Sequence, residues 1–180
     1  AVLVLSHLRD RKAVDSLIKV LDHRDPNVVQ EAIVALGRIG DSKAMPRVRQ
    51  FLNGEPWLQL GAIEAMGRLG TAEVVPDLEM LLPDPLLGPL VAEALTKIGG
   101  VDAVSTLVSY WLDNPEEWSS ESNLQKLADM LEALTSAPPP LEGVEDRLRE
   151  QVQGGDKEIR VQAVRCLVAL KGSNRGLWMF

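Results

Sequence analysis

The side chains best able to transfer protons, attack a substrate or bind a metal are few in this chain and widely spaced. It has two histidines, His7 and His23, and one cysteine, Cys166. A zinc site needs several such ligands at short spacing, and no His-x-x-x-His or Cys-x-x-Cys pattern occurs. The sequence therefore predicts no metal site, no cofactor and no catalytic residues, and we interpret the chain as a non-enzyme.

Each of these residues has a structural interpretation. We interpret His7 and His23 as surface residues, and Cys166 as a small buried residue of the last helix. The alternative for Cys166 is a reactive thiol, because the neighbouring Arg165 would favour the thiolate. A single cysteine cannot form a disulfide within the chain, which fits a reducing compartment, and we expect a cytoplasmic protein.

Charge is unevenly distributed along the 180 residues. Residues 1–50 carry 9 basic and 6 acidic groups, a net +3, whereas residues 51–146 carry 3 and 17, a net −14. Residues 147–180 return to +4, from 7 basic and 3 acidic groups. The acidic middle disfavours nucleic acid as a partner and favours a basic protein; the alternative is a coat that keeps the chain soluble. No apolar stretch reaches the roughly 20 residues that a membrane span needs, so we expect no membrane contact.

Sequence repeats explain how these residues are positioned. The segment Ala35–Gly40 returns as Ala65–Gly70 and, more weakly, as Ala94–Gly99. A second ladder of residues follows the same spacing of about 30. It comprises Ala13, Ala44, Val74 and Ala103, then Leu17, Val48, Leu78 and Leu107, then Leu21, Leu52, Leu82 and Trp111. Two ladders at one spacing indicate a true structural repeat, and they place Trp111 in the core.

Each repeat contains two helical patterns. The first helix is predicted to begin at an acidic residue followed by proline and to end at glycine. The starts are Asp25-Pro26, Glu55-Pro56 and Asp84-Pro85, and the closing glycines are Gly40, Gly70 and Gly99. We interpret the recurring glycines in general as helix stops. The second helix follows closely, Lys43–Leu52 in the clearest repeat, so the two helices must be antiparallel, and the pairs must stack to bury their apolar faces.

The repeat resembles a known family. The pattern Asp25-Pro26 … Ala35-Leu36-Gly37-Arg38-Ile39-Gly40-Asp41 … Ala44 … Val48 … Leu52 is similar to the short HEAT repeats of the phycobilisome-lyase type. The resemblance covers residues 1–113 and 156–171, although Val29 stands where that family often has arginine. It implies an all-α superhelix of about five antiparallel helix pairs, and it implies no particular activity.

We expect one HEAT-like repeat domain over residues 1–180. Within it we distinguish regular repeats (1–113), an expanded atypical repeat (114–155), a last helix (156–171) and a tail (172–180). Because Ala1–Leu5 matches the middle of a first helix, we expect the chain to be a fragment of a longer one.

The resemblance also implies that the second helices line the concave side of the stack. Their exposed positions pass from basic through acidic to hydroxyl-bearing side chains, which favours an extended protein partner with a basic patch. A tryptophan outside the ladders, in the acidic loop after Asp113, is a further contact candidate, as is Trp57. The predicted partner-binding residues are Lys43, Arg47, Gln50, Glu73, Asp77, Asp102, Thr106, Ser109 and Trp118.

Three functions fit the resemblance to different degrees. The leading hypothesis is a non-catalytic scaffold that binds a protein on its concave, centrally acidic face. The alternative is a lyase-type or chaperone-like subunit that acts on a tetrapyrrole-bearing protein. A DNA-repair glycosylase on a similar fold would need a basic groove, which the acidic middle disfavours.

Overall fold

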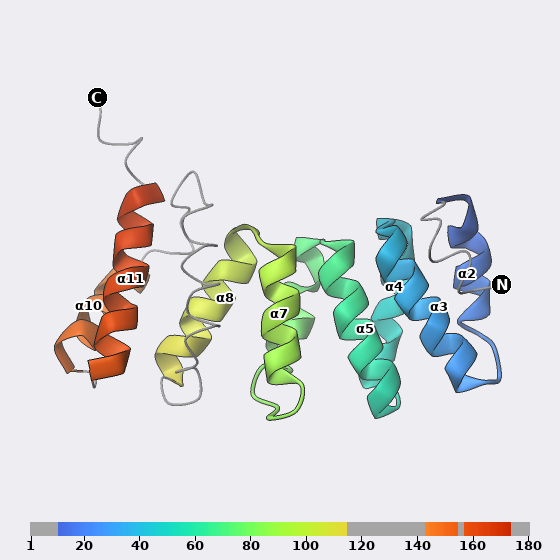
Figure 1. Cartoon of the computed structure of the whole chain (residues 1–180), viewed down its shortest axis with the longest axis horizontal. Coiled ribbons are helices and arrows are strands. Elements are labelled where there is room, and N and C mark those ends of the chain that lie inside the picture. The colour runs from blue at the N-terminus through green and yellow to red at the C-terminus, as the bar shows by residue number, and fades with distance from the viewer. Residues whose placement is uncertain (1–10, 115–142, 155–156, 174–180) are drawn as a thin grey trace. The chain divides into compact units, whose positions relative to one another are not determined.

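A computed structural model describes residues 11–114, 143–154 and 157–173, and all the regular secondary structure in these ranges is helical (Figure 1). This confirms the predicted all-α class of stacked helix pairs. The chain divides into two compact units, residues 1–98 and residues 99–180, which we describe one by one. The prediction of a single repeat domain stays a prediction.

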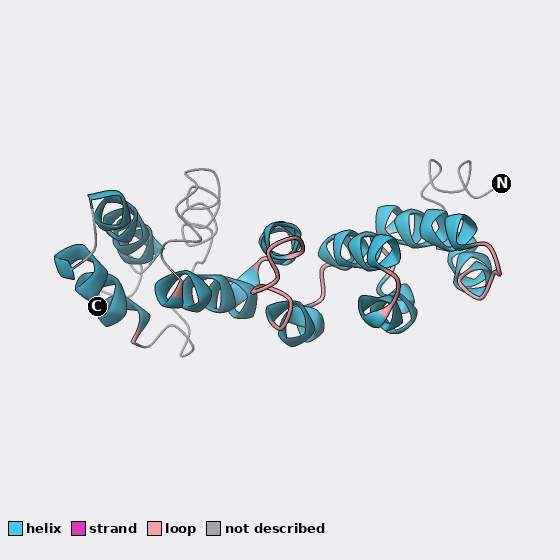
Figure 2. Ribbon diagram, turned by 90° about the horizontal axis from the view of Figure 1, so that it is seen from below, coloured by secondary structure: helices cyan, strands magenta, loops and turns pink. Residues whose placement is uncertain are grey.

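Unit 1 contains alternating first and second helices. The first helices are α3 (Pro26–Ile39), α5 (Pro56–Leu69) and α7 (Gly88–Ile98). The second helices are built from short pieces: η1 (Arg11–Ala13) with α2 (Val14–Val20), then η2 (Ser42–Ala44) with α4 (Met45–Val48) and η3 (Arg49–Asn53), then η4 (Ala72–Val74) with α6 (Val75–Glu79). Helix α3 packs against α2 and α5, and α5 packs in turn against α7. Figure 2 shows the helices of unit 1 in two rows.

The predicted ends of the first helices are largely confirmed. The Asp25 carboxylate Oδ1 accepts a hydrogen bond from the Asn27 N–H at 2.9 Å and so caps α3. Gly40 (φ 74°) and Gly70 (φ 66°) close α3 and α5 in the left-handed conformation, which costs glycine little because it has no Cβ. Helix α7 also ends before its glycine, but Gly99 adopts a different positive-φ conformation.

Two predicted helix starts differ in the structure. Glu55 stands at the N-cap of α5, but its side chain makes no capping hydrogen bond, because its extra methylene places the carboxylate beyond the first amides. The prediction that the next first helix begins at Pro85 is wrong, since α7 begins at Gly88. A helix from Pro85 would put Pro89 in its second turn, where the missing N–H and the ring would break the bond to the Pro85 carbonyl. The Asp84 carboxylate instead caps a turn by accepting from the N–H groups of Leu86 and Leu87.

The second helices are tighter and shorter than predicted. The continuous helix expected over Lys43–Leu52 is a 3-10 turn, one α-helical turn and a second 3-10 segment. Pro46 explains the break, because it cannot donate to the carbonyl four residues earlier but is tolerated near the start of α4. Pro76 has the same place at the start of α6.

The core of the chain follows the ladder read from the sequence. All twelve of its residues are buried, from Ala13 in η1 to Trp111 in the second unit. On the first helices the largest fully buried side chains include Ile33, Leu36, Ile63 and Met66. Within each unit, the helices thus bury their apolar side chains against one another, as repeat stacking requires.

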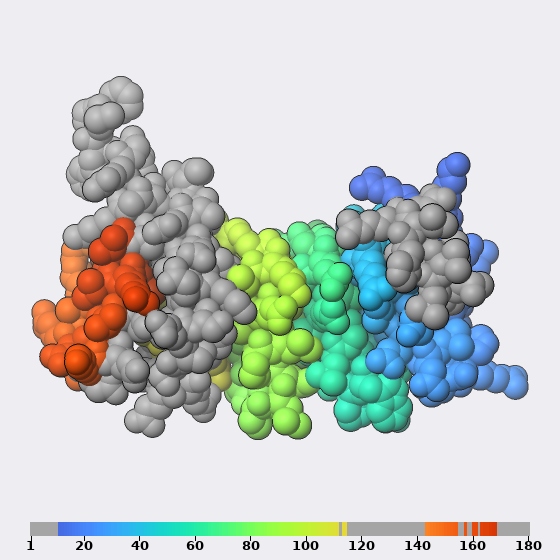
Figure 3. All heavy atoms as spheres, in the orientation of Figure 1, coloured from blue at the N-terminus to red at the C-terminus, as the bar shows by residue number. Residues whose placement is uncertain are grey.

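Two glycines inside the first helices are not helix stops, which corrects the general interpretation above. A Cβ added to Gly37 would lie 2.7 Å from the Ala65 Cα, and one added to Gly67 would lie 2.8 Å from the Ala94 Cα. Both distances are far below van der Waals contact. These glycines therefore let α3 and α5 approach the next first helix closely, and the helices adjoin one another in the space-filling view (Figure 3).

Unit 2 contains α8 (Gly100–Asp113), α10 (Val144–Gly154) and α11 (Lys157–Ser173). Helix α10 packs against both α8 and α11, and its Arg147 guanidinium forms an ion pair with Asp113 of α8. Helix α11 lies where the sequence predicts a last helix over residues 156–171, and it ends two residues later. Most of the expanded repeat, including Trp118, and most of the tail lie outside the described residues.

Candidate partner-binding surface

Five predicted contact residues lie on two successive second helices of unit 1. Lys43, Arg47 and Gln50 lie on η2, α4 and η3, and Glu73 and Asp77 lie on η4 and α6. The side chains of Lys43, Gln50 and Glu73 are exposed, whereas Arg47 and Asp77 are half-buried. These two second helices of unit 1 therefore present charged and polar side chains to solvent.

Lys43 and Arg47 form ion pairs with acidic residues of α2, the second helix of the preceding repeat, and of the turn after it. Lys43 Nζ lies 2.6 Å from Asp15 of α2, and an Arg47 guanidinium nitrogen lies 2.6 Å from Asp22 just beyond it. The hydrogen bond to Asp15 raises the pKa of Lys43 above its usual value, with a further contribution from the charge of Asp15. The positive charges of Lys43 and Arg47, which the sequence predicted as a basic part of the contact surface, are thus largely neutralised by acidic residues of the same chain.

An ion pair that was not predicted joins η3 to α6. An Arg49 guanidinium nitrogen lies 2.7 Å from Asp77 Oδ1, while Asp77 Oδ2 is buried and has no hydrogen-bond partner among the described residues. Arg49 was not among the exposed positions predicted on the second helices. The available signal was spacing, because Asp15 and Lys43 are 28 residues apart, as are Arg49 and Asp77, which is close to one repeat.

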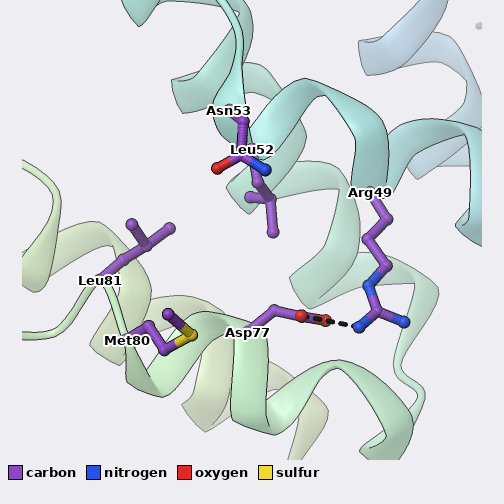
Figure 4. Close-up of a pocket in the computed structure, with 6 residues that line it drawn as sticks. All are labelled: Arg49, Leu52, Asn53, Asp77, Met80 and Leu81. Carbon is purple, nitrogen blue, oxygen red and sulfur yellow. Dashed lines mark hydrogen bonds and ion pairs between the residues drawn. The ribbon is translucent and has the colours of Figure 1, made fainter.

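The Arg49–Asp77 pair forms one wall of a pocket of about 170 Å³ (Figure 4). The residues around it come from η3 and from α6 and the turn that follows. They are Arg49, Leu52, Asn53, Asp77, Met80 and Leu81. The pocket therefore combines three apolar side chains with one amide and one ion pair.

Acidic side chains dominate the part of unit 1 that follows this pocket in the sequence. Residues 51–98 contain 7 acidic and 2 basic groups, a net −5. Both basic groups are already paired within their own helices, Arg68 with Glu64 at 2.7 Å and Lys97 with Glu93 at 2.8 Å. Glu73 and Glu79 are exposed, and neither forms an ion pair with a described cation. This surface has a negative charge that the described part of the chain does not neutralise.

The remaining predicted contacts belong to unit 2. Asp102 is exposed on α8, and Thr106 and Ser109 are half-buried on the same helix. Of the tryptophans, Trp111 is buried with 1% exposure, as predicted, and Trp57 is 45% exposed in the first turn of α5, as expected of a contact candidate. Further exposed apolar side chains are Leu60, Leu86 and, on α11, Val161, Val164 and Val168.

The residues with catalytic or metal-binding potential have structural roles where they are described. His23 Nδ1 accepts a hydrogen bond from the Asp25 N–H at 3.0 Å, so its ring stabilises the turn before α3. Within residues 11–114, 143–154 and 157–173, no group of three His, Cys, Asp or Glu side chains could hold a metal ion. Across the same ranges, no helix is both long and apolar enough to cross a membrane.

Cys166 is buried on α11, and this burial raises the pKa of its thiol to about 12. We predict that a disulfide reagent at pH 8 does not label Cys166 in the folded chain and labels it at once in denaturant. The thiol should also contribute stability below pH 9.0, the ordinary value, and lose that contribution as the pH rises toward 12, because ionisation is easier in the unfolded chain. Labelling of the native chain at the rate of a free thiol would contradict the buried placement.

Stacked helix pairs define a helical-repeat fold, and comparisons with known proteins agree. Residues 1–58 match the family model for HEAT repeats. An engineered protein aligns at 20% identity and a TM-score of 0.57, covering 96% of this chain and 85% of its own. The archaeal HEAT-like repeats protein from Thermococcus onnurineus NA1 aligns at 17% identity and a TM-score of 0.52, covering 96% and 93%. No curated protein sequence matches significantly.

Residues 1–58 therefore match HEAT repeats, and the fold of the chain is similar to that of a HEAT-like repeats protein, as the sequence pattern indicated. The phycobilisome-lyase subtype stays a prediction. HEAT-like repeats generally mediate protein–protein interaction.

Proposed function

We propose that this chain is a non-catalytic scaffold that binds a protein with a basic patch along the second helices of unit 1. The observation that supports this most is the uncompensated negative charge on η4 and α6. Glu73 and Glu79 are exposed there without a cationic partner among the described residues, while the basic groups nearby are already paired. A basic partner would supply the missing counter-charges, and steering by this field would speed its association.

Charge reversal tests the proposal. For a fluorescein-labelled peptide of alternating lysine and glycine, we expect Glu73→Lys with Glu79→Lys to weaken binding about three- to tenfold at low salt, because exposed ion pairs contribute up to about 1 kcal/mol each. The loss should shrink at about 0.5 M salt, where charges are screened over a few ångströms. Fluorescence anisotropy provides the measurement.

Glu31→Lys is the matched control, since Glu31 is an exposed acid on α3, a first helix. It should change the affinity less than the paired reversal does. If Glu31→Lys weakens the peptide as much as the reversal on η4 and α6, the binding reflects net charge alone and the proposed surface is wrong.

The lyase-type or chaperone-like role on a tetrapyrrole-bearing protein stays the alternative that the resemblance implied. The two functions differ in an optical readout. A chain that handles tetrapyrroles should shift the visible absorption band of added bilin to the red, whereas a protein scaffold should leave that spectrum unchanged.

A further inference from the structure

We propose that the pocket between η3 and α6 binds one aliphatic side chain of the partner, carried on a segment with lysine or arginine on both sides. This inference rests on the proposed function and adds to it the chemistry of the contact. It concerns unit 1 alone. The pocket would serve as the anchor, and the acidic side chains around it would select the flanking residues.

The size and lining of the pocket favour an aliphatic occupant. Its volume is about 170 Å³, and an apolar cavity of about 150 Å³ is enough to hold a molecule as large as benzene. Leu52, Met80 and Leu81 provide apolar walls from two sides, as Figure 4 shows. A leucine, isoleucine or methionine side chain would fit this space and would remove apolar surface from water on both partners.

Three contacts hold the pocket in shape before a partner arrives. Leu52 belongs to the buried ladder, and its carbonyl oxygen accepts a hydrogen bond from Gln59 Nε2 of α5 at 2.7 Å. The Arg49–Asp77 ion pair links η3 to α6 across the pocket. A preformed site loses less conformational entropy on binding, so this rigidity favours affinity.

Met80 is the adaptable part of the pocket wall. Its side chain is 81% exposed, although it lines the pocket. An unbranched thioether with this freedom can cover a bound side chain and adjust to its shape.

Charge complementarity identifies the flanking residues of the partner. Glu73 of η4, Asp77 of α6 and Met80 just after α6 follow a spacing of four and then three residues, which is the spacing of one side of a helix. Asp77 neutralises Arg49, so the nearest carboxylates along the chain without a described cation are Glu73, one helical turn before Asp77, and Glu79, next to the pocket residue Met80. A segment that inserts an aliphatic side chain here therefore meets carboxylates on its way in, and lysine or arginine neighbours would pair with them.

Three labelled peptides test the proposal on the full chain. The first has a central leucine between lysines, the second replaces that leucine by glycine, and the third keeps the leucine and replaces the lysines by glutamates. We expect the leucine peptide to bind about tenfold more tightly than the glycine peptide, since burying most of a leucine side chain gives about 1.5 kcal/mol or more. The glutamate peptide should bind more weakly than either.

Two neutral substitutions locate the effect. Met80→Ser should reduce the leucine-to-glycine affinity ratio from about ten to about three or less, because it removes a wall of the pocket. Leu86→Ser is the matched control: Leu86 is 84% exposed, and it lies outside the pocket, so the ratio should not change. Circular dichroism melting checks that both variants fold like the original chain.

The outcomes separate this inference from the proposed function. A leucine-to-glycine ratio near one, with binding still weakened by the Glu73 and Glu79 reversals, would overturn the pocket and leave the acidic surface standing. Tighter binding of the glutamate peptide would contradict the proposal that lysine or arginine flanks the aliphatic residue. A ratio that Leu86→Ser lowers as much as Met80→Ser does would place the contact elsewhere.

Discussion

Trp111→Ala is expected to reduce the free energy of unfolding by about 3–5 kcal/mol, the usual cost of removing a large aromatic side chain from a core. Trp111 is 1% exposed, and it occupies the ladder position held by Leu21, Leu52 and Leu82 in earlier repeats. The alanine variant would leave a cavity that the neighbouring side chains fill only in part. Urea unfolding followed by circular dichroism at 222 nm measures the loss.

Two further variants make this prediction specific. Trp111→Leu should cost clearly less than the alanine variant, because leucine is the ladder residue and because Trp111 Nε1 is buried without a partner among the described residues. Trp57→Ala should change the stability by less than about 1 kcal/mol, since Trp57 is 45% exposed. Equal losses for Trp57 and Trp111 would contradict the core placement.

The second large effect is expected at Gly67. A Cβ at this position would lie 2.8 Å from the Ala94 Cα and 3.0 Å from its Cβ, so α5 and α7 would have to move apart. Overpacking of this kind costs about 1–3 kcal/mol, against which alanine regains up to about 1 kcal/mol of helix propensity. We therefore expect Gly67→Ala to destabilise unit 1 despite alanine being the better helix former.

Gly61→Ala is a control in the same helix. A Cβ there would meet Ile33 Cγ2 at 3.7 Å, an ordinary contact, so helix propensity should dominate and the variant should be as stable as the original or more stable. The two substitutions thus have opposite predicted signs. Thermal melting of both variants side by side decides the matter, and a Gly67→Ala variant that matches Gly61→Ala would refute the close approach of α5 and α7.

Most of the fold could be predicted because the repeat spacing and the residues that cap helices can be recognised in the sequence alone. Burial of the ladder follows from an apolar residue recurring at the same place in each repeat, whatever the details of packing. The cap at Asp25 and the left-handed glycines at Gly40 and Gly70 need only neighbouring residues. The late start of α7 was also readable, because Pro89 excludes an earlier one, but the cap signal at Asp84-Pro85 favoured the wrong position.

The candidate site was predictable only in part. Glu73, Asp77 and Gln50 were placed on the second helices by register, and the structure has them there. Register could not indicate that Lys43 and Arg47 pair with Asp15 and Asp22, since an ion pair depends on how far one helix is shifted along its neighbour. Register did not place Arg49 among the exposed positions either, and only its spacing of 28 residues from Asp77 could have indicated its contact with the next repeat.

By itself, the sequence determined the helical repeats, the ladder of buried residues and the uneven charge, because each depends on residue types at fixed spacing. The tertiary structure decided how closely the first helices approach at Gly37 and Gly67, and which charges on the second helices are already paired. It also decided that Arg49, Leu52 and Met80 meet around one pocket. Distances between side chains of different repeats depend on the offset and separation of the helices, and these are set by the packing of the whole stack.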